Sequence, residues 1–225
     1  DEISIMSRKI SGSGCRSIYG GIVEWKKGLE EDGSDSYSVQ LQKESFWPEL
    51  RDIIVVVNAE EKKVSSSIGH TATVETSALY KERLNFVENQ ENPQLRKAIQ
   101  NKNFEAMAQI IMRDSDSLHA VMLDTWPPII YLNDNSKEVI YSILDLNKQN
   151  NKTIAAYTFD AGPNAHIITT NNHVDEIIEI LKHNKNLKIR TIIVSKQGLG
   201  PKLIIDKDLT NKILMVYNDL KHKLN

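Results

Sequence analysis

The sequence contains a single cysteine, Cys15, among its 225 residues. A disulfide framework is therefore excluded, and a lone thiol is typical of a protein from a reducing compartment, which predicts a cytoplasmic location. The six histidines are scattered along the chain, and no two of them have the spacing of a metal-ligand pair. We therefore predict no metal ligands among the side chains.

Long apolar runs and an excess of one charge are also missing. No uncharged run is long enough to span a bilayer and no signal peptide opens the sequence, so we predict no membrane partner. The formal net charge of −2 at pH 7 gives no general attraction for nucleic acid. An anionic ligand must therefore be bound by local cations. Asp1 is not an initiator residue, so we interpret the N-terminus as processed, truncated or unobserved.

Hydrophobic residues make up 40% of the chain and charged residues 26%, as in an ordinary globular protein. The apolar periodicity predicts a mixed α+β chain without repeats, whose clearest buried strand contains the β-branched run at residues 53–57. Residues 7–20 are rich in small residues and predict a loop that leads into a short helix. The predicted strands cover residues 21–25, 37–42, 51–58, 152–159, 165–170 and 188–195, and the predicted helices cover residues 66–90, 93–101, 103–122, 134–149, 173–183 and 210–220.

The most informative segment is DAGPNA at residues 160–165. Because residues 154–159 predict a buried strand, Asp160 places a carboxylate at a strand end, which is unfavourable unless the charge is paired or used. Gly162 and Pro163 predict a tight turn directly after it. This pattern can direct one carboxylate into a cleft. The alternative is that Asp160 supports the turn by bonding to its own backbone.

A second candidate is the segment SGSGCRS at residues 11–17. Its two glycines allow close backbone approach, and successive N–H groups can form an anion-binding nest at the start of a helix. Arg16 adds a planar donor pair that suits a carboxylate or a phosphate. The alternative is a flexible connector with solvated charges. We expect Cys15 to be a small buried thiol, since no histidine base is near it in sequence.

A third candidate, KKVSSSIGH at residues 62–70, follows the best strand and precedes a predicted helix. Its serines either cap that helix or belong to a loop of donors that closes over phosphate. Residues 114–128 have a structural interpretation, as a helix end with Trp126 packed beneath it. The GLGP segment at residues 198–201 is explained as a turn.

Taken in order, these motifs resemble those of the mevalonate diphosphate decarboxylase family, within the GHMP small-molecule kinase superfamily. The resemblance covers nearly the whole chain. The matching segments are SGSGCRS at 11–17 with Gly20 and Gly21, EDGSDS at 31–36, VSS at 64–66 with Gly69, SDSLH at 115–119, PPIIYLND at 127–134 and AYTFDAGPNA at 156–165.

The resemblance implies a GHMP-kinase-like, two-domain α+β fold and an ATP-dependent reaction, with Mg2+, on (R)-5-diphosphomevalonate. The products would be isopentenyl diphosphate, carbon dioxide, ADP and phosphate. It implies that Asp160 is the base beside the C3 hydroxyl and that Arg16 holds the substrate carboxylate, both as catalytic residues. Substrate-binding residues would be Ser11, Gly12, Ser13, Arg16, Ser67, His70 and Ala161, and nucleotide-binding residues would be Lys62 and Ser66.

The sequence departs from the family pattern at four positions. Ile10 replaces a usual glycine, Gly14 a usual alanine, His70 a usual methionine and Leu199 a usual serine. The family also has an N-terminal segment with the ATP phosphate loop, which this sequence does not contain. We therefore expect residues 1–45 to complete an N-terminal GHMP domain and residues 46–225 to form the C-terminal one, as a homodimer or with a complementing segment.

Two other functions remain open at this point. One is a mevalonate-type kinase that phosphorylates without decarboxylating, and Asp160 argues against it. The other is an inactive fragment or pseudoenzyme that binds a ligand or a partner, which Ile10 and the absent ATP loop keep open.

Overall fold

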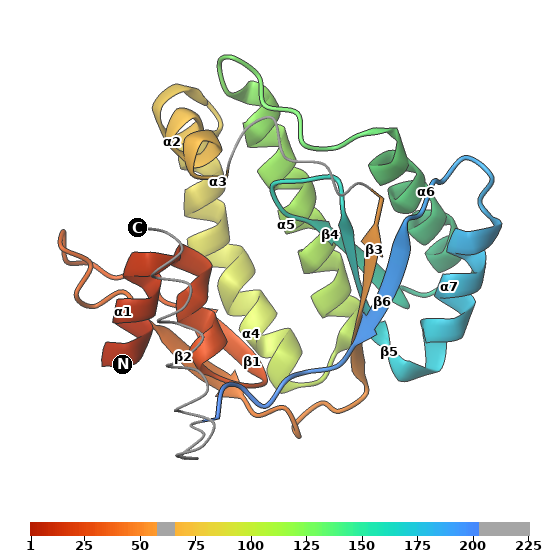
Figure 1. Cartoon of the computed structure of the whole chain (residues 1–225), viewed down its shortest axis with the longest axis horizontal. Helices are drawn as coiled ribbons and strands as arrows, with labels where there is room; N and C mark the ends of the chain where they lie inside the picture. The colour runs from red at the N-terminus through yellow and green to blue at the C-terminus, as the bar shows by residue number, and fades with distance from the viewer. Residues whose placement is uncertain (58–65, 203–225) are drawn as a thin grey trace, which may run out of the picture. The chain divides into compact units, whose positions relative to one another are not determined.

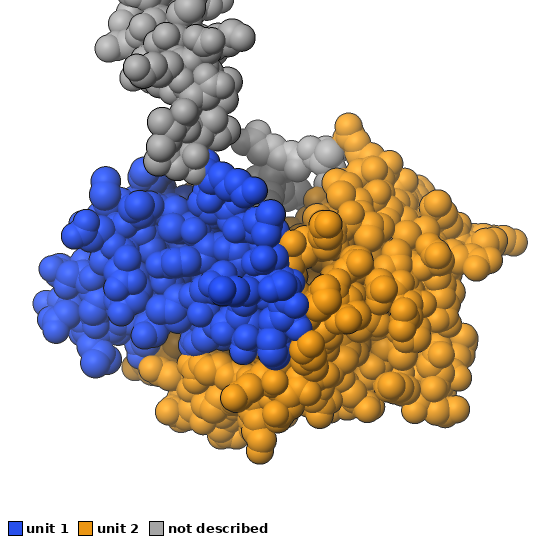
Figure 2. Space-filling model, turned by 90° about the horizontal axis from the view of Figure 1, so that it is seen from below, with its two compact units in different colours: residues 1–46, 198–225 blue, residues 47–197 orange. Residues whose placement is uncertain are grey.

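The computed structural model describes residues 1–57 and 66–202 (Figure 1). The chain forms two compact units, drawn in blue and orange in Figure 2. Unit 1 contains residues 1–46 and the residues from Gly198 onward, and unit 2 contains residues 47–197. Helices and strands are mixed in both, in agreement with the predicted α+β class. No helix in the described ranges is both long and apolar enough to cross a membrane.

The described part of unit 1 contains two helical segments and a two-stranded antiparallel sheet. The loop predicted at the start of residues 7–20 is wrong, because residues up to Ile10 belong to a helix. Glu2 lies in its first turn and Arg8 and Lys9 in its last, where each charge complements the helix dipole. The elements of unit 1 are α1 (Glu2–Ile10), the 3-10 helix η1 (Gly12–Ile18), β1 (Ile22–Trp25) and β2 (Ser38–Gln42).

Unit 2 is built on a four-stranded antiparallel sheet with the order β4-β5-β3-β6. Alternate residues of β3 are buried, with Ile53 and Val55 fully inaccessible, as expected for a strand with one face on a core. The strands are β3 (Leu50–Val56), β4 (Ala155–Phe159), β5 (Ala165–Thr170) and β6 (Thr191–Ser195).

Helices α6 and α7 cover one face of this sheet, and α5 lies against β4 (Figure 1). The main core joins Ile53 and Phe159 of the sheet to Ile143 of α6 and Leu181 of α7, all at most 1% exposed. The helical segments of unit 2 are α2 (Ser66–Thr76), α3 (Tyr80–Phe86), the π-helix η2 (Val87–Glu91), α4 (Asn92–Gln100), α5 (Phe104–Asp124), α6 (Asp134–Gln149), the 3-10 helix η3 (Asn171–His173) and α7 (Val174–His183).

Two strands, β4 and β6, begin three residues later than predicted, and in both cases an asparagine side chain accepts a hydrogen bond from an amide in the predicted start. Asn147 Oδ1 accepts hydrogen bonds from Ile154 N at 2.8 Å and Ala155 N at 3.1 Å, and β4 starts at Ala155 and not at 152. Asn135 Oδ1 accepts from Lys188 N at 2.8 Å, and β6 starts at Thr191 and not at 188. The helix predicted at 210–220 lies outside the described residues.

The single helix predicted over residues 66–90 is wrong, since α2 ends at Thr76 and α3 begins at Tyr80. Asp124 causes the break from the far end of α5. Its Oδ2 accepts hydrogen bonds from Ser77 Oγ at 2.7 Å and from Leu79 N at 3.0 Å. Asp124 is thus structural, as expected, but Trp126 beside it is 74% exposed and does not pack beneath the helix end.

The hydrogen bonds that Asp124 accepts should contribute to stability in a way that depends on pH. The hydrogen bonds from Ser77 and Leu79 hold the pKa of Asp124 below its usual 3.8, so the contribution is present above pH 3.8 and is lost as the pH falls through the lower folded value. Asp124→Ala should lower the urea midpoint at pH 7, and the difference from wild type should shrink below pH 3.8. Asp145→Ala, on the exposed side of α6, is the control; an equal loss there would contradict this role.

The units differ from the predicted domains, 1–45 and 46–225, in the placement of the residues that follow Gln197. Gly198 O accepts a hydrogen bond from Gly21 N at 2.9 Å within unit 1. A Cβ on Gly20 would collide with the backbone of Leu199, so close packing requires glycine there. We had assigned these C-terminal residues to the second domain, whereas their first described part packs in unit 1.

Candidate functional site

Asp160 follows the last residue of β4 and is exposed, whereas Phe159 before it and Ala161 after it are buried. Gly162 N donates to the Asp160 backbone oxygen at 2.7 Å, which closes the tight turn predicted from Gly162 and Pro163. Among the described residues, the Asp160 carboxylate has no hydrogen-bond partner. The structure therefore does not support the alternative in which this carboxylate holds its own turn.

Other groups fix the turn on three sides. Ser136 Oγ donates to Pro163 O at 2.9 Å, and Asn164 Oδ1 accepts from Val57 N at 2.9 Å. Ser115 Oγ of α5 accepts from Phe159 N at 3.0 Å. These bonds hold the backbone on both sides of Asp160, so its carboxylate is exposed from a rigid support.

Ala161 belongs to a small core with Met122, Ile129 and Tyr131, against which Ala72 of α2 also packs. Gly69, one turn earlier on α2, is buried so close to Tyr131 that a Cβ there would collide with the Tyr131 hydroxyl. This core therefore links the Asp160 turn to the first turns of α2.

The third sequence candidate lies at the start of α2. Ser66 and Ser67 are its first two residues, and His70 is exposed one turn on. His70 directly follows Gly69, which packs against Tyr131, and Ala161 belongs to the same small core. Lys62 lies outside the described residues.

His119 of α5 is a residue that we had assigned only a structural role. It is 7% exposed, and its ring lies edge-on to Tyr131 and to Phe159, at centroid distances of 6.5 and 6.3 Å. Its Nε2 atom is buried without a hydrogen-bond partner in the described structure. Burial lowers the pKa of His119 below 6.5, opposed by a bond to the Phe159 backbone and by the charge of Asp160. Burial therefore favours the neutral form of the His119 imidazole at pH 7.

His166 of β5 is a second histidine whose pKa depends on the charge of Asp160, and the sequence alone did not indicate this. Its Nδ1 lies 2.9 Å from Oδ2 of Asp52, on the neighbouring strand β3. The hydrogen bond to Asp52 raises the pKa of His166 above 6.5, and the charge of Asp160 acts in the same direction. The carboxylate of Asp160 is thus close enough to influence two histidines on different elements.

Unit 1 carries the other group of predicted residues, on η1 and the residue before it. Ser11, Gly12, Ser13 and Arg16 are all exposed, whereas Cys15 between them is fully buried. The expected buried thiol is therefore confirmed. Because the exposed residues lie in or directly before one short 3-10 helix, a ligand there can contact several of them together.

Buried bonds anchor this helix from beneath. Cys15 Sγ lies 3.1 Å from both Gly12 O and Ser38 Oγ, and Ser4 Oγ donates to Cys15 O at 3.1 Å. Ser38 N donates to the same Ser4 hydroxyl at 2.9 Å. The segment is thus a fixed surface of unit 1, which argues against the flexible-connector alternative.

Arg8, three residues before this segment, has a structural role in unit 1. Its Nη2 donates to Gly33 O at 2.9 Å and so holds the loop between β1 and β2. Within the predicted group, Arg16 remains the exposed guanidinium.

The family of the mevalonate 5-diphosphate decarboxylase C-terminal domain matches residues 52–191. The chain belongs to the mevalonate diphosphate decarboxylase family. The diphosphomevalonate decarboxylase-like N-terminal domain family matches residues 1–38. The two matched ranges carry the two groups of predicted residues, Ser11 to Arg16 and Ser66 to Ala161.

Curated relatives agree with this assignment. Diphosphomevalonate decarboxylase from Bos taurus is 44% identical over 183 residues, which cover 81% of this chain and 46% of the relative. The enzyme from Aspergillus fumigatus is 49% identical, over 73% of this chain and 41% of the relative. The enzyme from Danio rerio is 43% identical, over 92% of this chain and 60% of the relative. The chain thus spans about half the length of the curated relatives it matches.

Solved structures agree in fold. A crystal structure of mevalonate 5-diphosphate decarboxylase matches with a TM-score of 0.81 at 34% identity, over 92% of this chain and 63% of the other. The decarboxylase from Trypanosoma brucei matches with a TM-score of 0.81 at 28% identity, over 91% of this chain and 64% of the other. The architecture is therefore that of the mevalonate diphosphate decarboxylase family.

The structure accounts for some departures from the family pattern. Ile10, in place of a usual glycine, is the last residue of α1 and is 90% exposed, so it leaves the following segment unobstructed. A Cβ on Gly14 would lie 2.8 Å from Ser7 Oγ, a flexible side-chain end that can move. The same Cβ would lie 3.3 Å from the Ser7 backbone oxygen, so the usual alanine would also require a small shift of the backbone at the end of α1.

The two histidines beside Asp160 predict opposite titrations. NMR titration should give His119 a pKa below 6.5 and His166 a pKa above 6.5. The Asp52–His166 contribution to stability is therefore complete below pH 6.5 and is lost as the pH rises through the folded value. Asp52→Asn should lower the pKa of His166 alone, and Asp145→Asn on α6 should change neither. A His166 pKa at or below 6.5 in wild type would contradict the pairing.

Proposed function

We propose that the protein converts (R)-5-diphosphomevalonate and ATP to isopentenyl diphosphate, carbon dioxide, ADP and phosphate. The observation that carries the proposal is the exposed carboxylate of Asp160, on a turn held by Ser115, Ser136 and Asn164. The family membership of residues 52–191 supplies the substrate class.

In the proposed reaction, Asp160 orients the tertiary C3 hydroxyl of the substrate and accepts its proton as the oxygen attacks the γ-phosphate of ATP. Phosphate then leaves C3, and the electron pair of the breaking carbon–carboxylate bond forms the double bond as carbon dioxide departs. A carboxylate next to C3 stabilises the positive charge that develops there. A fixed support for Asp160 favours both roles, because no reorganisation is needed during the reaction.

Arg16 would bind the substrate carboxylate through its paired N–H donors, with Ser11, Gly12 and Ser13 contacting the substrate from the same surface. On unit 2, the proposed substrate-binding residues are Ser67, His70 and Ala161. The exposure of Ser11, Gly12, Ser13 and Arg16, anchored by the buried Cys15, supports this assignment.

A nucleotide and a magnesium ion fit this proposal. The neighbour MDDEF was solved in complex with MVAPP, AMPPCP and magnesium, at 28% identity and a TM-score of 0.79. Within the described ranges, no three carboxylate, histidine or cysteine side chains come together as a metal site. Magnesium would therefore be held mainly by phosphate oxygens and water, as is usual beside a nucleotide. Lys62 and Ser66 would contact the phosphates.

The proposal includes a place in isoprenoid biosynthesis by the mevalonate pathway, and in sterol biosynthesis where the organism makes sterols. It also includes a cytoplasmic location, which the lone buried thiol of Cys15 favours, and a homodimer. Light scattering of the purified protein tests the homodimer, and fractionation of cells tests the location.

The test of the reaction is product analysis by mass spectrometry of the full gene product with ATP, magnesium and 5-diphosphomevalonate. Isopentenyl diphosphate formed in equal amounts with ADP is the expected result. A phosphorylated acid that keeps its carboxylate would identify a kinase and overturn the decarboxylase. No product and no ADP from a folded, substrate-binding protein would identify an inactive homologue.

A further inference from the structure

Glu91 is a buried carboxylate far along the chain from the proposed reaction residues. It is the last residue of η2, its side chain is 4% exposed, and neither Oε1 nor Oε2 has a hydrogen-bond partner in the described structure. A buried carboxylate without a partner is strongly unfavourable, and π-helical turns such as η2 often occur at functional sites. The two carboxylate oxygens of Glu91 therefore have no hydrogen-bond donor in the protein, and a ligand can supply one.

The cations nearest to Glu91 are engaged elsewhere. The Arg83 guanidinium pairs with Asp114 at 2.5 Å and donates to Ser117 Oγ at 2.9 Å. The Arg113 guanidinium lies over the Phe86 ring, 4.6 Å from its centroid. Both act on Glu91 at longer range without a hydrogen bond to it.

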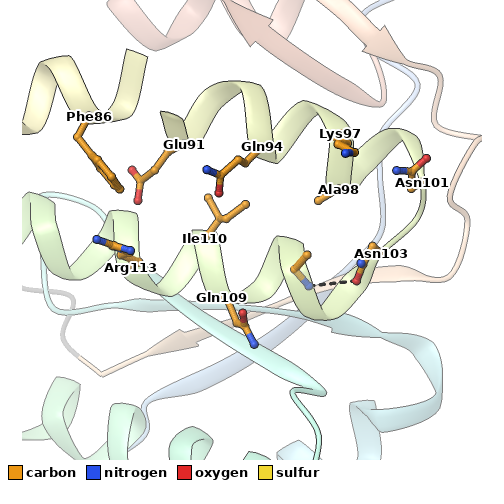
Figure 3. A pocket seen from close by; sticks show the side chains of 11 residues that line it. Phe86, Glu91, Gln94, Lys97, Ala98, Asn101, Asn103, Gln109, Ile110 and Arg113 are labelled. Atoms are coloured by element: carbon orange, nitrogen blue, oxygen red, sulfur yellow. Dashed lines mark hydrogen bonds between the residues drawn. The ribbon is translucent and has the colours of Figure 1, made fainter. Parts of the chain in front are cut away.

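Glu91 lies in the wall of a cavity of about 400 Å³ between η2, α4 and α5 (Figure 3). Its carboxylate points from the α4 side toward α5, between Phe86 and Gln94 (Figure 3). Ile110 and Ala98 give the cavity an apolar side, and Gln94, Asn101 and Gln109 add amide groups. The exposed cations Lys97 and Arg113 also line it. A second cavity of about 240 Å³ also has Glu91 and Ile110 in its wall.

We propose that this cavity binds a small organic cation with a planar guanidinium or amidinium head. The two free oxygens of one carboxylate match two parallel N–H donors, which is the strongest pairing that such a group makes. The carbonyl oxygens of Gln94 and Gln109 can accept further N–H groups, and Ile110 and Ala98 provide an apolar contact for a short hydrocarbon stem.

Other classes of ligand fit less well. An anion could pair with Lys97 or Arg113 in the same wall but would leave both Glu91 oxygens without a partner. A divalent metal would find one carboxylate where it prefers several oxygen ligands. In the described part of the chain no group of three metal-binding side chains occurs. The site is also independent of the proposed decarboxylation, since none of its residues belongs to the substrate or nucleotide contacts assigned above.

The same burial predicts how binding depends on pH. Burial and the charge of Asp114 raise the pKa of Glu91 above 4.5, while Arg83 and Arg113 act in the opposite direction. A guanidinium ion binds the ionised form, so its affinity should increase as the pH rises through the pKa of Glu91.

The test is a titration of the purified chain with methylguanidinium chloride, followed by amide chemical shifts at constant ionic strength. Saturable binding with a Kd on the order of 1 mM is expected for a head group of this size. Glu91→Gln keeps the shape and removes the charge, and should weaken binding at least tenfold. Glu105→Gln, an exposed carboxylate in the first turn of α5, is the matched control and should bind as wild type does.

A second variant keeps the test decisive if Glu91→Gln fails to fold. Ala106→Phe fills the cavity from α5 without changing any charge, and should also abolish binding. The proposal is overturned if wild type shows no saturable shifts at about 20 mM probe, far above the expected Kd. It is equally overturned if Glu91→Gln or Ala106→Phe, folded by its amide spectrum, binds with unchanged affinity.

Discussion

Asp160→Asn should reduce kcat by about 10²–10⁴-fold while leaving KM for 5-diphosphomevalonate nearly unchanged. Asparagine has almost the same shape, so the substrate still fits, but it cannot accept the C3 hydroxyl proton during phosphoryl transfer. An interaction made only in the transition state lowers kcat and kcat/KM equally. Steady-state kinetics of the full gene product, with ADP and isopentenyl diphosphate measured separately, give this comparison.

The control for Asp160→Asn is Asp145→Asn, which removes an exposed carboxylate from α6 and should leave kcat unchanged. A second readout does not depend on turnover. Because the charge of Asp160 raises the pKa of both His119 and His166, its removal should lower both values. Wild-type kcat in Asp160→Asn would remove Asp160 from the mechanism, whatever the histidines show.

A role of Asp160 in the decarboxylation step alone, after phosphorylation, would give a different result. If Asp160 acted only on the departing carboxylate, Asp160→Asn would still consume ATP and would accumulate the C3-phosphorylated acid. The proposed base role instead predicts that ADP and isopentenyl diphosphate fall together. The ratio of the two products therefore separates these roles within the same experiment.

The sequence predicted those parts of the fold that depend on local pattern. The β-branched run of β3 and the alternation in β5, residues 165–170, gave these strands within about two residues, because one face of each lies on the core. The turn after Asp160 was also predictable, since Gly162 and Pro163 restrict the backbone by themselves.

Long-range hydrogen bonds explain most of what the sequence did not predict. The break between α2 and α3 depends on Asp124, which is 45 residues from Leu79. The predicted first residue of β6, Lys188, instead donates to Asn135, which is 53 residues away. Neither contact leaves a pattern in the local sequence, so propensity alone predicted an unbroken helix and a longer strand.

In the candidate site, too, features set by the local sequence were predicted and features set by distant residues were not. Asp160 was predicted from its place at a strand end, whereas the histidines near it were not, because their environment is created by neighbours on other elements. His119 is defined by Tyr131 and Phe159, and His166 by Asp52 on the adjacent strand. A lone histidine on a helix face gives no signal of an unpartnered Nε2.

Phe159→Ala should lower the free energy of unfolding of unit 2 by about 3–5 kcal/mol, the usual range for emptying a buried phenylalanine site. Phe159 is 1% exposed in the main core, and its ring contacts Tyr157 at a centroid distance of 6.1 Å and His119 at 6.3 Å. Such aromatic pairs add about 0.5–1.5 kcal/mol beyond the burial itself. The loss is a large fraction of the ~5–15 kcal/mol that stabilises an ordinary domain.

Hydrogen exchange of the β4 and β5 amides measures this loss within unit 2, without assuming that both units unfold together. Phe104→Ala, at the half-buried first residue of α5, is the control and should cost clearly less. Phe159→Leu refills most of the volume but removes the edge contact with His119, so it should recover stability while the pKa of His119 shifts. A loss below about 1 kcal/mol in Phe159→Ala would mean that the core collapses around the gap and does not hold the Asp160 turn rigidly.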